Sequence, residues 1–365
     1  MTDSTLHWLR LHLTPGLGRR GLVRLIAAFG SPATALAATP GAWQERAGIR
    51  AAVAQQRPSA TDPLLQQAAD ALEGCGARIV SLWDPAYPAL LRQIHDPPAL
   101  LYLRGTLPES AAIQVAVVGA RRASPAGRQL TGEICRALAG QGLVIVSGLA
   151  RGIDTAAHRA ALAAGGLTVG VLGCGIDLVY PPENEALVEG ILEKGAILSE
   201  YPPGTQPLPG HFPGRNRIIS GLCRGVLVVE AAAGSGSLIT VDFALEQGRE
   251  VFAVPGPVHG ATSGGVNQLL KEGAHLVTEA GDILDILAPN RRDHAPPADD
   301  QFSSTLDPGA LKLFQELSKE PLHIDDLTGR SGLTPMEVST ILLDLELQGC
   351  VEQLPGMRYI RNRRG

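Results

Sequence analysis

The sequence predicts an α/β protein: a Rossmann-like, doubly wound and mostly parallel sheet, flanked by an N-terminal helical domain and a C-terminal winged-helix domain. From Ile113 onward, short apolar runs typical of buried strands alternate with helical segments. Helical patterns without such strands occupy residues 5–70, and another helical group follows a polar, proline-rich stretch at 289–308. We therefore expect a helical domain over residues 1–80, a Rossmann-like domain over 81–288, a linker over 289–306 and a winged-helix domain over 307–365.

The composition is that of a folded protein without a disulfide framework. The chain has 365 residues, of which 45% are hydrophobic and 18% charged, enough for large buried cores. Its five cysteines include no C-x-x-C pair, which argues against a zinc site and favours a reducing compartment. The N-terminus lacks a secretion signal and no apolar run is long enough to span a bilayer, so we expect a cytoplasmic protein without membrane contact.

A glycine hairpin near the N-terminus allows two interpretations. Gly16-Leu17-Gly18 precedes an apolar-periodic segment at residues 22–29. A Gly-x-Gly hairpin that opens a helix exposes backbone N–H groups, which helix-hairpin-helix modules use to hold a DNA phosphate. Arg19, Arg20 and Arg24 lie nearby. A small helical domain whose glycines merely turn the chain explains the same residues, and the sequence leaves both interpretations open.

The central segment predicts a series of strands whose carboxyl ends carry small-residue turns. We expect parallel strands at 115–118, 144–147, 168–172, 196–199, 226–229, 250–254 and 275–277, with helices at 126–139, 155–164, 183–193 and 237–247. A further strand is expected at 99–104, after two proline-set turns that we interpret as the seam between domains. The turns are Gly119-Ala120-Arg121, Gly148-Leu149-Ala150-Arg151, Gly173-Cys174-Gly175 and Gly234-Ser235-Gly236. Right-handed crossovers would bring these turns to one edge of the sheet.

Residues 212–240 combine two features of an anion site. Arg215, Asn216 and Arg217 precede the strand at 226–229, and Gly234, Ser235, Gly236 and Ser237 follow it. Backbone N–H groups freed by small residues, beside guanidinium groups, bind phosphate. Arg121, Arg122 and Arg151 follow neighbouring strands, and this many arginines favours a chain of phosphates over one or two. The formal net charge of −5 means that any contact with nucleic acid must come from such a local patch.

The sequence contains few candidate catalytic groups. None of the turns that follow the predicted strands is a full G-x-G-x-x-G, and there is no Walker A motif, so we expect no dinucleotide cofactor and no P-loop ATPase. Asp154 and His158 are spaced for a metal pair or a proton relay, but without a third ligand a helix-capping Asp beside a core His is preferred. Ser237 and Thr240 are possible nucleophiles, but no His can be identified as their base. Glu230 is the best candidate for an isolated catalytic carboxylate. We expect no metal and no enzymatic activity.

The C-terminal segment has the pattern of a helix-turn-helix with a wing. Helices are predicted at 309–317, 324–328 and 335–347, with Thr334 capping the last, and a hairpin at 351–360. A helix that reads the major groove should present Arg, Lys, Asn or Gln, whereas this helix carries Glu337, Asp344 and Glu346. We therefore expect a protein contact here. A group of terminal arginines argues against a protein contact: Arg358, Arg361, Arg363 and Arg364.

Together, these motifs resemble the DprA/Smf family of bacterial DNA-processing proteins, over almost the whole chain. The most specific stretches are DPAYPALLRQIHDPPALLYLRG (84–105), VAVVGARRAS (115–124), SGLARGIDTAAHRAAL (147–162), FPGRNRIISGL (212–222) and GSGSLITVDFALEQGREVFAVPG (234–256). The resemblance implies a non-enzymatic protein that binds single-stranded DNA and helps load the RecA recombinase onto it, protecting incoming strands during natural transformation. It also implies a homodimer formed through the Rossmann-like domain.

The resemblance carries DNA-binding roles onto particular residues. The implied pocket comprises Gly119, Arg121, Phe212, Arg215, Asn216, Arg217 and the loop Gly234, Ser235, Gly236 and Ser237; to these we add Arg122, Ser124, Ser147, Gly148 and Arg151 from the adjoining motifs. Phe212 would offer a base a stacking face worth ~1–3 kcal/mol. Two departures remove polar contacts: Ala120 replaces the usual serine, and Pro209 lies where many members have a nearby Lys or Arg.

Two other functions fit parts of the sequence. The sheet and its glycine loop resemble phosphoribohydrolases of the cytokinin-activating type, nucleotide-cleaving enzymes whose loop reads PGGxGT before a glutamate. This chain reads AAAGSGSLIT instead. A transcription factor acting through the winged helix would explain the C-terminal segment, but the acidic helix argues against it.

Overall fold

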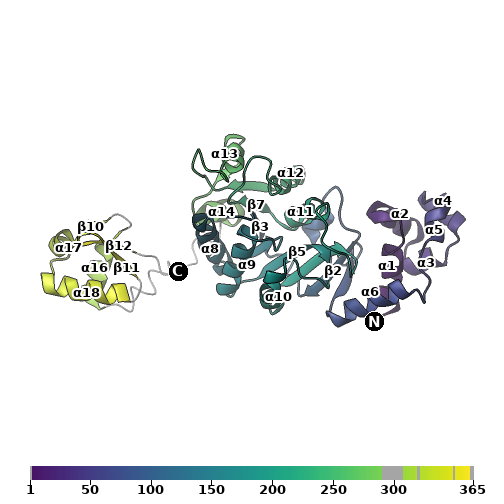
Figure 1. The fold of residues 1–365 in the computed structure, drawn as a ribbon, viewed down its shortest axis with the longest axis horizontal. Helices are drawn as coiled ribbons and strands as arrows, with labels where there is room; N and C mark the ends of the chain where they lie inside the picture. Colours follow the sequence, from purple (N-terminus) through teal and green to yellow (C-terminus); the bar gives the residue numbers. More distant parts are fainter. Residues whose placement is uncertain (1, 290–306, 319–320, 348–349, 362–365) are drawn as a thin grey trace. The chain divides into compact units, whose positions relative to one another are not determined.

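The computed structural model describes residues 2–289, 307–318, 321–347 and 350–361, and most of the predicted linker lies outside these ranges. The chain forms two compact units, Met1–Asn290 and Arg291–Gly365, drawn in purple to green and in yellow in Figure 1. The first unit contains a nine-stranded sheet, and the second a three-stranded sheet with helices. The predicted fold class is confirmed. Among the described residues, no helix has the length and apolar character needed to cross a bilayer.

The first unit begins with short helices whose starts follow from their capping residues. They are α1 (Asp3–His12), α2 (Gly18–Phe29), α3 (Pro32–Ala37), α4 (Pro40–Ala47), α5 (Ala51–Gln55) and α6 (Pro63–Gly74). Ser31, Thr39 and Asp62 each accept a hydrogen bond from a backbone N–H of the first turn, and proline follows each of them at the first helical position. Trp43 is fully buried among these helices.

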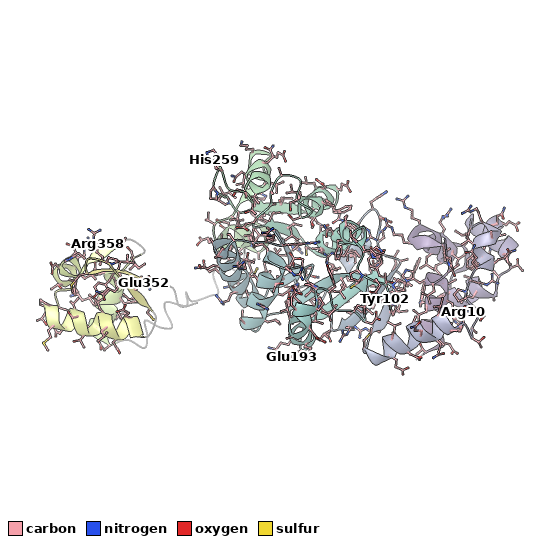
Figure 2. All side chains as sticks on the ribbon, in the orientation of Figure 1. Arg10, Tyr102, Glu193, His259, Glu352 and Arg358 are labelled. Atoms are coloured by element: carbon pink, nitrogen blue, oxygen red, sulfur yellow. The ribbon has the colours of Figure 1, made fainter. Side chains whose placement is uncertain are left out.

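The helical region packs directly on the sheet. Nδ1 of His12, on α1, lies 2.7 Å from the hydroxyl of Tyr102 on strand β2 (Leu100–Gly105), and Figure 2 shows Tyr102 where the helices meet the strands. Leu9 and Leu65 share a buried cluster with Tyr102. Strand β1 (Arg78–Ser81), which the sequence analysis did not predict, pairs with β2 and extends across the boundary expected at residue 80. The helices and the sheet therefore form one compact unit.

The sheet has the strand order β1-β2-β6-β5-β4-β3-β7-β8-β9. The further strands are β3 (Gln114–Val118), β4 (Val144–Ser147), β5 (Thr168–Gly175), β6 (Ala196–Tyr201), β7 (Gly225–Val228), β8 (Glu250–Ala253) and β9 (His275–Leu276). All pairs from β6 to β9 are parallel, and β1 and β2 are attached antiparallel at one edge. Every strand that the sequence predicts in this segment is present.

Helices cover both faces of the sheet, as Figure 1 shows. One face is covered by α7 (Ala89–Arg92), α11 (His211–Leu222), α12 (Leu238–Glu246) and α13 (Gly264–Lys271). The other face is covered by α8 (Pro125–Gly140), α9 (Ile153–Ala163), α14 (Ala280–Leu287), η1 (Pro182–Asn184) and α10 (Glu185–Leu192). The central strands are buried on both sides, which explains their nearly continuous apolar runs.

The strand order creates a switch point at the centre of the sheet. From β3 the chain builds outward through β4, β5 and β6, and it then returns to build outward on the other side through β7, β8 and β9. The loops that leave β3 and β7 therefore diverge, and sheets of this kind bind ligands in the crevice beside the carboxyl ends of such strands. The residues that follow β3 and β7 are the glycine- and arginine-bearing turns predicted to converge.

Helix α11 is the main element that the sequence analysis did not predict. Pro213 and Gly214 lie in its first turn and gave a loop-like pattern, but proline is compatible with a first turn because no intrahelical N–H bond is lost there. Arg215, Asn216 and Arg217 are consequently helical and at most 9% exposed, rather than part of a surface loop.

The second unit has the predicted winged-helix elements. They are α16 (Pro308–Glu316), β10 (Leu322–His323), α17 (Ile324–Ser331), α18 (Pro335–Leu347), β11 (Val351–Leu354) and β12 (Arg358–Arg361). Thr334 caps α18 as expected: its backbone N–H and hydroxyl donate to the Glu337 carboxylate at 2.8 and 2.7 Å, and its hydroxyl oxygen accepts from the Glu337 N–H at 3.4 Å. Arg363 and Arg364 lie outside the described residues.

Candidate nucleic-acid interface

A cavity of about 470 Å³ lies at the switch point. Its walls come from the turn after β3, the start of α11, and the loop between β7 and α12. The lining includes Gly119, Ala120, Arg121, Arg122, Asp154, Phe212, Arg215, Asn216, Ser235, Gly236, Ser237 and Thr240. Three of the four predicted glycine turns, at 119–121, 148–151 and 234–236, therefore converge as expected. The fourth, Gly173-Cys174-Gly175, is not a turn but the end of strand β5. Gly119 is required by close packing, because a Cβ there would lie 2.7 Å from the Ile153 side chain.

Phe212 lies in the first turn of α11, and two arginine guanidinium groups lie over its ring. The guanidinium carbons of Arg121 and Arg215 are 5.4 and 6.0 Å from the ring centroid, within the range of cation–π attraction. Tyr180 lies at a centroid distance of 5.7 Å, with its ring tilted by 40°. Gly173, near the end of β5, leaves room for the Phe212 ring, since a Cβ there would lie 2.9 Å from it. An aromatic face and two arginines thus meet at one wall of the cavity.

Arg215 is only 4% exposed and is held by backbone oxygens. Its Nη1 donates to the carbonyls of Gly148, at 2.8 Å, and Val171. Burial and the nearby Arg121 lower the pKa of Arg215 to about 10, which Asp154 opposes, so the guanidinium stays charged at neutral pH. Its Nε has no hydrogen-bond partner among the described residues. The cavity therefore has a fixed positive charge in its wall.

Asp154 is a cavity residue to which the sequence analysis assigned only a capping role. Its carboxylate accepts from the N–H groups of Gly148 and Ala150 at 3.1 and 3.3 Å, and so shapes the turn after β4. Burial raises its pKa to about 6, although Arg215 acts in the opposite direction. His158 does not pair with it: Nδ1 of His158 lies 2.7 Å from the Thr168 hydroxyl. Among the described residues, no group of three His, Cys, Asp or Glu side chains is arranged to hold a metal ion.

The loop between β7 and α12 supplies small polar groups. Gly234 has φ +75°, a left-handed conformation that favours glycine, while Ser235, Gly236 and Ser237 line the cavity. The side-chain amide of Asn216 donates to the Gly236 carbonyl at 3.2 Å and connects the loop to α11. The N-terminus of α12 follows at once, without a side-chain cap.

A smaller cavity of about 30 Å³ adjoins the first, and the two share Arg121, Ala150 and Phe212. Arg151 lines the smaller cavity and is exposed, and its guanidinium pairs with the Glu183 carboxylate. Arg121 and Arg122 are likewise exposed. Accessible arginines thus extend from the switch point toward the carboxyl end of β4.

Three predicted site residues have other partners and do not line either cavity. Arg217 is 3% exposed and pairs with Glu200 at 2.6 Å and Asp96 at 3.7 Å. Ser124 caps α8 by accepting from Gly127 at 2.9 Å. Ser147 is fully buried and donates to the Val117 carbonyl at 2.6 Å. Their sequence neighbourhood suggested ligand contacts, but their side chains stabilise the fold.

Glu230, which the sequence analysis named as the best candidate for an isolated catalytic carboxylate, likewise makes hydrogen bonds within the fold. Its two oxygens accept from the Ser124 hydroxyl and backbone N–H at 2.5 and 3.0 Å.

In the glycine hairpin of the helical region, Arg19 pairs with Asp96, whereas Arg20 and Arg24 remain exposed. The two interpretations of that hairpin stay open.

Family models match the chain in three consecutive parts. They are the DprA-like N-terminal HHH domain over residues 2–62, DNA recombination-mediator protein A over 78–288, and the DprA winged helix domain over 294–357. The protein Smf of Escherichia coli K12 is 43% identical over 288 residues, covering 76% of this chain and 75% of the relative. The chain belongs to the DprA/Smf family. The resemblance seen in the sequence motifs is thus confirmed, and the family is one of DNA-processing recombination mediators.

Other DprA proteins agree with this membership. DNA processing protein DprA of Streptococcus pneumoniae is 50% identical over 204 residues, covering 56% of this chain and 72% of that protein. A crystal structure of DprA from S. pneumoniae matches with a TM-score of 0.69 at 39% identity, covering 79% of this chain and 99% of the other. A structure of DprA from Helicobacter pylori, described for its single-stranded DNA binding mode, matches with a TM-score of 0.52 at 30% identity, covering 58% and 96%.

Proposed function

We propose that this DprA/Smf protein binds single-stranded DNA along the two adjoining cavities at the switch point. The observation that carries the proposal is Phe212, whose ring lies beside Arg121 and Arg215 in the cavity wall. A phosphate site needs only cations and N–H groups, whereas a nucleic-acid strand also needs an aromatic face for its bases. The DNA-binding relative from H. pylori supports this ligand.

The strand would be held by groups of three kinds. Arg121 and Arg122 are exposed and suited to phosphates, and the loop of Gly234, Ser235, Gly236 and Ser237 offers N–H groups at the start of α12. Phe212 would stack on a base, which is worth ~1–3 kcal/mol. Arg151 would exchange Glu183 for a phosphate. Gly119, Gly148, Arg215 and Asn216 would shape the cavity, whereas Arg217, Ser124 and Ser147 are not proposed as DNA contacts.

The role we propose is not enzymatic. Glu230 and Asp154, the two carboxylates considered as catalytic candidates, accept hydrogen bonds from Ser124 and from the turn after β4. The Ser124 hydroxyl beside Glu230 caps α8 and lines neither cavity, which weakens the phosphoribohydrolase alternative.

The protein would act as a mediator that helps load the RecA recombinase onto the bound strand, during DNA uptake by natural transformation and in recombination. The family description as a recombination mediator supports this step. We further propose that it works in the cytoplasm as a homodimer formed through the Rossmann-like domain.

Salt-titrated binding to a fluorescent oligonucleotide tests the DNA site. Phe212→Ala should weaken binding about 5- to 150-fold, the equivalent of ~1–3 kcal/mol, with an unchanged salt slope. Arg121→Ala should also reduce the salt slope, by about one counterion. Arg159→Ala, on the exposed side of α9, is the control and should bind as the wild type does. Equal affinity of all four proteins would place the DNA elsewhere.

The mediator role has a separate assay. The wild type should speed formation of RecA filaments on oligonucleotide coated with a single-strand binding protein, and Phe212→Ala should lose this effect. A wild type that binds the oligonucleotide yet leaves filament formation unchanged would contradict the mediator role alone. Nucleotide turnover by the pure protein would instead revive the enzyme alternative.

A further inference from the structure

The turn after β4 has the geometry of an anion-binding site. Leu149 is 1% exposed and has φ +59°, and this left-handed turn points the backbone N–H groups of Gly148 and Ala150 at one atom. Successive N–H groups that converge around a left-handed residue form a backbone nest, which binds anions. The atom they meet is Oδ2 of Asp154, at 3.1 and 3.3 Å. The protein's own carboxylate therefore occupies this anion-binding site.

A buried cation adjoins the same turn. The guanidinium of Arg215 packs against Gly148, since a Cβ on that glycine would lie 2.5 Å from Nη2. Burial lowers the pKa of Arg215, and the charge of Asp154 opposes that shift, so the two groups attract each other. Arg215 is 4% exposed and lines the cavity, and its Nε donates to no acceptor within the described ranges. A charged guanidinium with an unused donor beside converging N–H groups is the combination that phosphate sites use.

Asp154 is the group of this site whose charge changes near neutral pH. Burial raises its pKa to about 6, although Arg215 and the hydrogen bonds to the carboxylate act in the opposite direction, so it is ionised at pH 7.5 and mostly neutral at pH 5. His158, one turn further along α9, stays neutral because burial lowers its pKa to about 3. Burial raises the pKa of Cys174, on β5, to about 11. Arg121, from the turn after β3, keeps its charge throughout this range.

We propose that Asp154 determines the specificity of the cavity: its carboxylate occupies the anion site of the turn after β4 and excludes free phosphate and mononucleotides. A single phosphate would have to bind beside a like charge, with few other contacts to offset the repulsion. A DNA strand spreads its contacts over Arg121, Arg122 and Phe212 and does not need this site. The choice of a strand rests on the proposed function, whereas the exclusion of small anions does not.

Calorimetric titration of the full-length protein with sulfate, at constant ionic strength, tests this exclusion. Sulfate has the tetrahedral shape of phosphate and keeps the same charge at pH 5 and pH 7.5. At pH 7.5, Asp154→Asn should bind sulfate at least about tenfold more tightly than the wild type, because the like charge is gone. Deoxyadenosine monophosphate should show the same order. Adding Arg215→Met to Asp154→Asn should abolish the gain, which locates the sulfate at this turn.

Asp177→Asn is the matched control. Asp177 also accepts a backbone hydrogen bond, from the Gly204 N–H at 2.9 and 3.0 Å to its two oxygens, but it lines neither cavity. This variant removes the same charge from the chain and should bind sulfate as the wild type does.

The wild type at pH 5 gives a second test that needs no substitution of Asp154. Protonation of this carboxylate should let the wild type bind sulfate about as tightly as Asp154→Asn does, whose own affinity should change little between pH 7.5 and 5. Arg215→Met, which lacks the cation of this site, should gain nothing at pH 5. A gain in that protein as large as in the wild type would come from protonated histidines elsewhere and would contradict the proposal.

The proposal is wrong if folded Asp154→Asn binds sulfate no better than the wild type, if Asp177→Asn gains as much, or if the wild type binds no more tightly at pH 5 than at pH 7.5. Urea unfolding shows which variants are folded, and the pH comparison decides alone if Asp154→Asn is not. Oligonucleotide binding is measured separately. If no protein binds the oligonucleotide while the sulfate results hold, the proposed function fails and the role of Asp154 stands.

Discussion

The packing of Gly148 against Arg215 makes a sharp prediction for Gly148→Ala. A Cβ at position 148 would lie 2.5 Å from Nη2 and 2.7 Å from Cζ and Nη1 of Arg215. The φ angle of Gly148 is not in the left-handed region, so backbone strain contributes nothing and the clash alone determines the effect. Arg215 cannot yield freely, because it is 4% exposed and bonded to the carbonyls of Gly148 and Val171.

The expected cost follows from those contacts. A hydrogen bond made by a charged group contributes ~1.5–3 kcal/mol, so displacing the guanidinium from one or both carbonyls costs on the order of 3 kcal/mol. Replacing glycine by alanine returns about 0.4–1 kcal/mol through the entropy of the unfolded chain. We therefore expect Gly148→Ala to lower the free energy of unfolding by about 2 kcal/mol.

Urea unfolding with a matched control measures this cost. Gly132→Ala lies within α8 and meets no atom within 4 Å, so it should stabilise the protein by ~0.5–1 kcal/mol. In an Arg215→Met background the cost of Gly148→Ala should largely disappear, giving a coupling free energy of about 2 kcal/mol between the two sites. If Gly148→Ala is as stable as Gly132→Ala, or if the two substitutions at 148 and 215 are additive, the inferred packing is wrong.

Three further predictions concern residues that hold the site. Ser124→Ala should lower the free energy of unfolding by ~1–2 kcal/mol, measured in urea, because it removes the cap of α8. Arg217→Gln should destabilise by about 3 kcal/mol through the unpaired Glu200, while the folded fraction binds oligonucleotide normally; an affinity loss without a stability loss would contradict this. Burial lowers the pKa of His158 to about 3, so it stays neutral in the folded protein. The unfolded chain gains a proton below pH 6.5, and stability present above that pH is therefore lost as the pH falls. Between pH 7.5 and 5 the His158 contribution is a loss of roughly 2 kcal/mol, while Asp154, whose pKa is raised to about 6, contributes a gain over the same range. The wild type should therefore lose roughly 2 kcal/mol more than His158→Gln, whereas His259→Gln, at the exposed position labelled in Figure 2, should behave as the wild type does.

Elements whose patterns are local could be predicted from the sequence. Apolar runs followed by glycine turns identify the parallel strands, since strands buried on both faces need continuous apolar residues. Right-handed crossovers then bring those turns to one edge. Local pattern also identified Thr334 as the cap of α18 and the acidic character of that helix. Part of the candidate site was predicted as well. Phe212, Arg121 and the loop of Ser235 and Gly236 were expected to lie together, and they line one cavity.

Which polar residues face the cavity could not be predicted without the folded structure, because their partners are distant in sequence. Arg215 and Arg217 are two residues apart on α11, yet one lines the cavity and the other pairs with Glu200 and Asp96. Their different positions follow from the rotation of the helix, and nothing in the sequence pattern indicated that α11 exists. Likewise, the pairing of Ser124 with Glu230 spans 106 residues and depends on β3 and β7 being neighbours in the sheet. Strand order is set by the packing of the whole sheet, so contacts across the switch point cannot be read from either segment alone.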